Sequence, residues 1–67
     1  MNTQRVKERM EDMGITVGRM SQELGMDPST YYRKMQKNGE EFSALDLMVF
    51  KSVLKMDEKT ALDFLLS

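Results

Sequence analysis

The chain has 67 residues, a net charge of −1, and neither cysteine nor histidine. A chain of this length forms one small domain, which buries only about 60% of the surface that the unfolded chain exposes. The missing residue types exclude disulfide scaffolds, Cys/His zinc sites, thiol nucleophiles and imidazole bases. The longest apolar run, residues 47–50, is too short to span a bilayer. We therefore expect residues 1–67 to form one cytoplasmic domain that is not an enzyme, with no cofactor, metal, membrane partner or small-molecule ligand.

Apolar spacing and capping residues predict an all-α fold. Val6, Met10 and Met13 recur at i, i+4 and i+7, the spacing of one buried helical stripe. Gly14 follows as a residue that can take the left-handed conformation that ends helices, and Thr16 is a good cap for the next helix. No stretch alternates as a strand does. The five expected helices cover residues 3–13, 17–24, 28–37, 44–55 and 58–66.

The third predicted helix has a strong start signal. Asp27 is expected to cap its free amides, and Pro28 suits its first position because no hydrogen bond is needed there. Tyr31 and Met35, one turn apart, are expected to face the core. The Asn-Gly pair at 38–39 is expected to end the helix.

The C-terminal half contains two further cap signals. Ser43 and Asp46 have the spacing of a capping box, and Asp57 is expected to cap the fifth helix. Phe42 follows a polar loop and is expected to fill the core. The fourth helix has apolar residues on more than one side, so its periodicity does not show which side is buried. Those residues are Leu45, Leu47, Met48, Val49, Phe50, Val53 and Leu54.

Residues 16–35 contain the most informative pattern. Only Gly25, Met26 and Asp27 separate the second and third predicted helices, which favours a steep crossing over an antiparallel pair. Ser21 is small enough to let the two backbones approach, and Met26 places an apolar side chain in the turn. Together these features predict a helix-turn-helix at the second and third helices of a compact five-helix domain.

This segment resembles the helix-turn-helix of phage repressor and Cro-like (Xre-type) regulators, at Met20-Ser21, Leu24-Gly25-Met26 and Ser29-Thr30. The chain is also similar to small prophage regulators of low-GC Gram-positive bacteria, at residues 29–35, 38–39, 42 and 61–66. The resemblance runs from Val6 to Leu66. It implies a lambda-repressor-like fold, dimeric operator binding and transcriptional control. Val17 and Pro28 depart from it, since the family often has a phosphate-contacting glutamine and a base-reading polar residue there.

A recognition helix enters the major groove with its N-terminal part against the base edges. If Tyr31 and Met35 face inward, the opposite side of residues 28–37 faces outward. We expect base contacts from Ser29, Tyr32 and Arg33, and Arg33 can make the bidentate contact to guanine. Phosphate contacts are expected near the start of the second helix and along the third. The phosphate-contacting residues are expected to be Thr16, Arg19, Thr30, Gln36 and Lys37.

Charge is distributed unevenly along the chain. Residues 1–39 carry a net charge of +2, whereas residues 40–67 carry −3. The basic half suits double-stranded operator DNA as the partner. The surplus of apolar residues in the last two helices favours a homodimer, at least on DNA, with contacts expected at Met48, Val49, Leu65 and Leu66. The alternative is a protein-interaction module, an antirepressor or co-regulator that keeps the fold without strong DNA binding.

Overall fold

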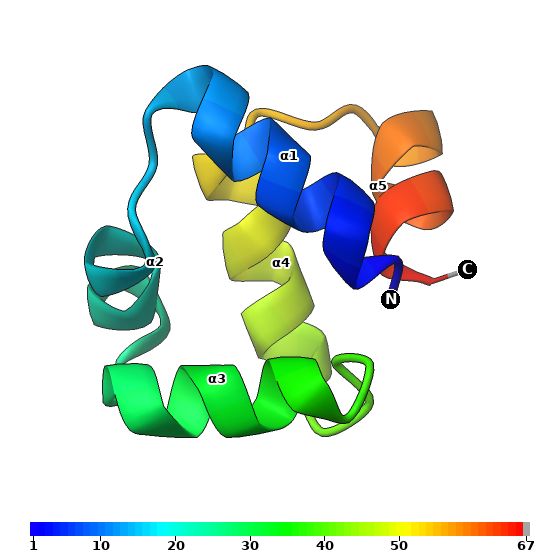
Figure 1. The fold of residues 1–67 in the computed structure, drawn as a ribbon. Helices are drawn as coiled ribbons and strands as arrows, with labels where there is room; N and C mark the ends of the chain where they lie inside the picture. The colour runs from blue at the N-terminus through cyan, green and yellow to red at the C-terminus, as the bar shows by residue number, and fades with distance from the viewer. Residues whose placement is uncertain (67) are drawn as a thin grey trace.

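Residues 1–66, the part of the chain that the computed structural model describes, contain five helices joined by turns and loops, and no strand (Figure 1). The helices are α1 (Thr3–Met13), α2 (Val17–Leu24), α3 (Pro28–Gln36), α4 (Ala44–Val53) and α5 (Glu58–Leu65). The prediction of five helices is confirmed, although α3, α4 and α5 end one or two residues earlier than expected. The Cα radius of gyration, 10.6 Å, matches the value of about 11 Å for a globular chain of this length. Ser67, the last residue of the predicted domain, lies outside the described residues.

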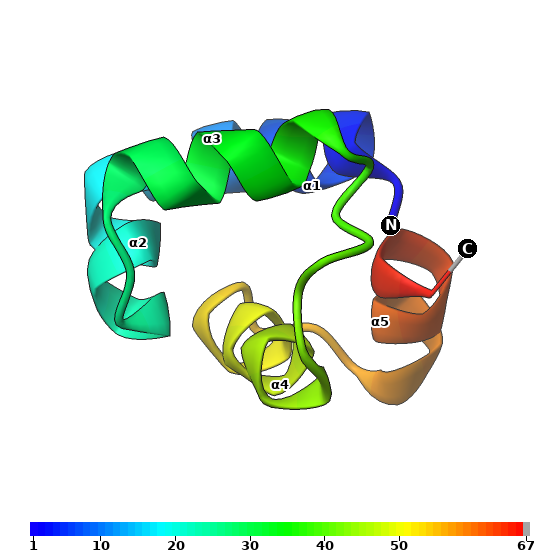
Figure 2. The ribbon, with the colours of Figure 1, turned by 90° about the horizontal axis from the view of Figure 1, so that it is seen from below.

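The helices form two layers that α2 connects. Seen from below, α1 and α3 lie on one side of the molecule, α4 and α5 lie on the other, and α2 crosses between them at one edge (Figure 2). The core lies between the layers and contains three aromatic rings, those of Tyr31, Phe42 and Phe50. The ring centroids of Phe42 and Phe50 are 5.1 Å apart, and those of Tyr31 and Phe50 are 6.3 Å apart. Phe42 therefore fills the core as expected.

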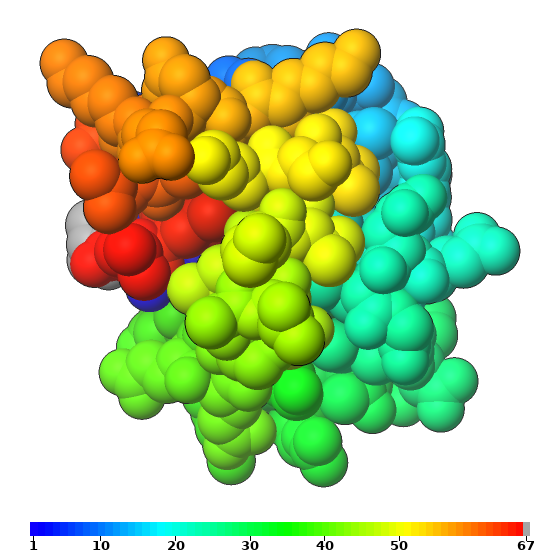
Figure 3. Space-filling model, turned by 180° about the vertical axis from the view of Figure 1, so that it is seen from behind, coloured from blue at the N-terminus to red at the C-terminus, as the bar shows by residue number. Residues whose placement is uncertain are grey.

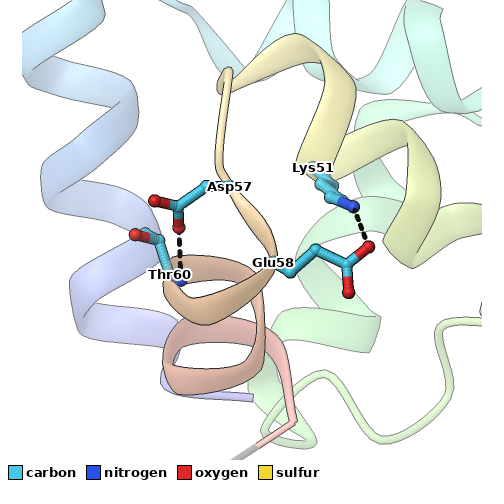
Figure 4. Close-up of polar contacts among 4 residues, drawn as sticks. All are labelled: Lys51, Asp57, Glu58 and Thr60. Atoms are coloured by element: carbon cyan, nitrogen blue, oxygen red, sulfur yellow. Dashed lines mark hydrogen bonds and ion pairs between the residues drawn. The ribbon is translucent and has the colours of Figure 1, made fainter.

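Most of the predicted helix ends are confirmed. The side chain of Thr16 accepts a hydrogen bond from the amide of Arg19, and Ser43 and Asp46 form the reciprocal bonds of a capping box. Asp57 accepts from the amide of Thr60 at 2.7 Å (Figure 4). Gly14 has the expected left-handed conformation, with a φ of 69°.

One expected cap is wrong. Asp27 occupies the N-cap position of α3, but its side chain makes no capping hydrogen bond. Pro28 removes only the first amide of the helix, whereas an N-cap side chain accepts from the second or third, so nothing in the structure explains the missing bond. The main-chain carbonyl of Asp27 still accepts from the amide of Tyr31 at 3.0 Å.

Two arginines of α1 connect it to the C-terminal half of the chain. The guanidinium of Arg9 donates from Nε and Nη2 to the carbonyl of Leu54, at 3.0 and 2.8 Å, and from Nη2 to the carbonyl of Lys55. These bonds satisfy carbonyls at the end of α4, where no glycine follows to close the helix. Arg5 lies over the ring of Phe64, 4.4 Å from its centroid. Both contacts join distant parts of the sequence, and no local pattern of residues predicts them.

The buried Tyr31 hydroxyl makes fold stability sensitive to alkaline pH. It donates to Sδ of Met10 at 3.3 Å, and burial raises the pKa of Tyr31 from its usual 10.0 to about 12, with a smaller contribution from Tyr32. As the pH rises, the unfolded chain therefore loses the Tyr31 hydroxyl proton at a lower pH than the folded chain does. The contribution of the protonated Tyr31 hydroxyl to stability is complete below pH 10 and is lost as the pH rises to about 12.

We expect the wild-type free energy of unfolding to fall by up to about 2–3 kcal/mol across this range because of Tyr31 alone. Tyr31→Phe keeps the ring but has no proton to lose, so its stability curve should be flatter there. Urea unfolding of both proteins at a series of pH values checks this. Parallel curves would show that Tyr31 ionises as easily in the fold as in the unfolded chain.

Candidate nucleic-acid interface

The outward side of α3 presents the residues expected to contact DNA bases. Ser29, Tyr32 and Arg33 are exposed, as is Gln36 one turn further on. Tyr31 is buried on the opposite side of the helix, and Met35 is half-buried against the core, as predicted. Since α3 contains no acidic residue, nothing within the helix repels an anionic partner.

The guanidinium of Arg33 and the ring of Tyr32 have different surroundings. Among the described residues, no hydrogen bond or ion pair engages the side chain of Arg33, so its donors are available. The ring of Tyr32 packs edge-on against Tyr31, with centroids 5.9 Å apart, while 55% of the residue stays exposed. The contact with Tyr31 therefore restrains the ring of Tyr32, whereas the hydrogen-bond donors of Arg33 remain unpaired within residues 1–66.

The amino end of α2 lies next to the outward side of α3. Thr16 and Val17 line a groove together with Tyr32 and Gln36, so the start of α2 and the outer side of α3 are neighbours. Within residues 1–66 the main-chain amides of Val17 and Gly18 have no hydrogen-bond acceptor. Free amides at a helix amino end bind anions, aided by the helix dipole. Val17 can therefore offer its backbone amide where its side chain cannot donate.

Two residues expected to contact phosphate are less available than predicted. Lys37 pairs with Glu41 through Nζ and Oε2, which are 2.8 Å apart, and this hydrogen bond and charge lower the pKa of the Glu41 carboxyl. A phosphate would have to displace that carboxylate to reach Lys37. Thr30 is half-buried. Arg19 and Gln36 are exposed, and no hydrogen bond of either side chain is seen among the described residues.

A second surface lies on α4 and α5, which cross the face opposite to that of Figure 1 (Figure 3). Four large apolar residues there, each more than half exposed, form what we call the α4–α5 patch: Leu45, Met48, Leu62 and Leu66. An exposed ion pair also joins the two helices, with Nζ of Lys51 3.3 Å from Oε1 of Glu58 (Figure 4).

The residues expected to contact a second copy differ in exposure, and one of them belongs to the core. Met48 and Leu66 are exposed as expected, but Leu65 is only 5% exposed and belongs to the core, and Val49 is half-buried. The reason is the rotation of α5, which turns Ala61 and Leu65 inward. Leu62, which was not among the expected contacts, is exposed instead.

No protein-family model, curated protein or solved structure matches the chain. Within residues 1–66, no helix combines the length and apolar composition needed to cross a membrane. The same residues contain no group of three acidic side chains placed to hold a metal ion.

Proposed function

We propose that this chain is a sequence-specific regulator of transcription that binds double-stranded DNA, of the Cro-like phage or prophage type. In this proposal α2, the turn at 25–27 and α3 form a helix-turn-helix, and α3 reads the major groove. The observation that carries it is the exposed, acid-free side of α3 beside the free amides of α2.

Each exposed group has a role suited to its chemistry. The free guanidinium of Arg33 pairs with the O6 and N7 acceptors of a guanine, and Ser29 and Tyr32 contact neighbouring base edges. The amides of Val17 and Gly18 bind a phosphate and set the register of the helix on the duplex. Arg19 and Gln36, together with Thr16, extend this phosphate contact.

A dimer completes the proposal. One recognition helix reads only a few base pairs, too few to select a single genomic site. α4 and α5 lie in the layer opposite to α1 and α3, so the α4–α5 patch and the outward side of α3 are on different surfaces of the molecule. Pairing through this patch, with Met48 and Leu66 in contact, would leave two α3 helices free to enter successive major grooves of a palindrome, about 34 Å apart.

The dependence of affinity on salt tests this function. If each subunit of a dimer binds about three phosphates, log affinity should fall against log salt with a slope of about −5, from about −0.9 per phosphate. Fluorescence anisotropy on a site selected from random DNA gives the slope. Lys59→Ala, an exposed change on α5, is the control that should leave it unaltered. A slope indistinguishable from zero would exclude electrostatic DNA binding.

The α4–α5 patch supports a second candidate function. Its exposed apolar residues are also what a protein-interaction module would present to another regulator. An antirepressor or co-regulator of this kind would keep the fold and bind protein instead of DNA. A zero salt slope together with a normally folded chain would favour this function.

A further inference from the structure

A groove lies between α1 and α3. Its volume is about 720 Å³, and the first turn of α2 contributes Thr16 and Val17 to its lining. Figure 1 shows α1 and α3 on either side of this face, with α2 at one edge. Three buried residues line its floor: Met10, Ile15 and Tyr31.

The chemistry of the lining is apolar and aromatic. The one polar side-chain atom of Tyr31 already has a partner, because its hydroxyl donates to Sδ of Met10. The half-buried Val17 and Met35 add apolar surface, and the exposed Tyr32 adds an aromatic ring. Thioether sulfurs make favourable contacts with aromatic rings, so a lining that contains both Met10 and Met35 suits a ring-containing ligand.

The charges at the rim are balanced. Lys7 and Glu11 both line the groove from α1, four residues apart and of opposite sign, and the remaining polar lining residues are neutral. The side chains of this rim therefore carry no net charge. The volume lies within the range of about 300–1,000 Å³ that is usual for small-molecule sites.

We propose that this groove binds an uncharged, ring-containing hydrophobic molecule and that its binding opposes the binding of operator DNA. The second half of the proposal rests on the proposed function. Thr16, Tyr32 and Gln36 line the groove and also belong to the surface assigned to DNA. A ligand that holds these side chains in the groove removes them from the duplex. The site departs from the expectation of no small-molecule ligand because only the fold brings α1, α2 and α3 together.

The ligand site is tested first without DNA. The probe is N-phenylnaphthylamine, an uncharged aromatic dye that fluoresces in apolar surroundings, and two-dimensional amide NMR spectra locate where it binds. We expect shifts confined to α1, α3 and the start of α2. Met35→Gln places an amide in the groove and should weaken dye binding about ten-fold. The matched control is Met13→Gln, the same change at a half-buried methionine of α1 that does not line the groove, which should leave the affinity unchanged.

Several outcomes would overturn the site. Dye shifts on α4 and α5, or equal affinities for the wild type and Met35→Gln, would show that the groove is not the binding surface. A groove covered by a second copy of the chain would appear as dye binding that weakens at higher protein concentration. Should Met35→Gln fail to fold by circular dichroism, Val17→Gln makes a comparable change at the other end of the groove.

The opposition to DNA is measured separately. We expect saturating dye to weaken binding to the selected DNA site about ten-fold, within the usual range of coupling between two sites. Unchanged DNA affinity with the dye bound would overturn the coupling and leave the ligand site standing. A chain that binds the dye in the groove but no DNA would instead contradict the proposed function.

Discussion

Replacing Phe50 with alanine is expected to lower the free energy of unfolding by about 3–5 kcal/mol, the usual cost of removing a buried aromatic side chain. Phe50 is 0% exposed, and its ring packs against those of Tyr31 and Phe42. It lies on α4, and its ring packs this helix against the loop at Phe42 and against α3. Truncation would leave a cavity between the two layers of the fold.

The size of this effect matters because the domain is small. A core in a chain of this length supplies only about 3–5 kcal/mol of stability, so Phe50→Ala should leave most of the protein unfolded in buffer. Urea unfolding followed by circular dichroism measures the change. Ser52→Ala, an exposed change on the same helix and outside the α4–α5 patch, should cost no more than about 0.5 kcal/mol. Similar losses for the two variants would contradict the burial pattern of α4.

Arg33→Ala is expected to weaken binding to the selected DNA site by about 1–3 kcal/mol, which is roughly a 5- to 150-fold loss, and to relax the preference at one base pair. Arg33 is exposed on α3, and its guanidinium makes no hydrogen bond or ion pair within residues 1–66. The change therefore removes no such bond, and the fold should be retained. Affinities for the selected site and for single-base variants of it, at one fixed salt concentration, give both quantities.

Arg33→Lys separates base recognition from charge. Lysine keeps the positive charge but loses the planar pair of donors that matches guanine, so most of the base preference should be lost while the salt slope is kept. Lys59→Ala on α5 is the control for loss of one exposed charge. If Arg33→Ala folds normally and binds its site as tightly as the wild type, Arg33 is only a surface charge.

The number of helices and most of their ends could be predicted because the signals are local. Gly14 ends α1, Thr16 caps α2, and Ser43 with Asp46 caps α4, each through bonds within a few residues of itself. The same holds for the outward side of α3, since Tyr31 marks its inward side by its apolar ring. Asp27 is the exception, since it occupies the N-cap position of α3 but its side chain makes no capping hydrogen bond.

The tertiary structure decided everything that depends on contacts between distant residues. α5 has apolar residues on both sides, and only its packing decides that Leu65 is buried while Leu62 is exposed. The bonds from Arg9 to the end of α4 join residues 45 and 46 positions apart, and no periodicity reports such a contact. The groove between α1 and α3 arises for the same reason, since a hollow belongs to the arrangement of helices and not to any one of them. Local sequence thus determined the helices and the exposed side of α3, whereas long-range packing determined which surfaces remain free to bind.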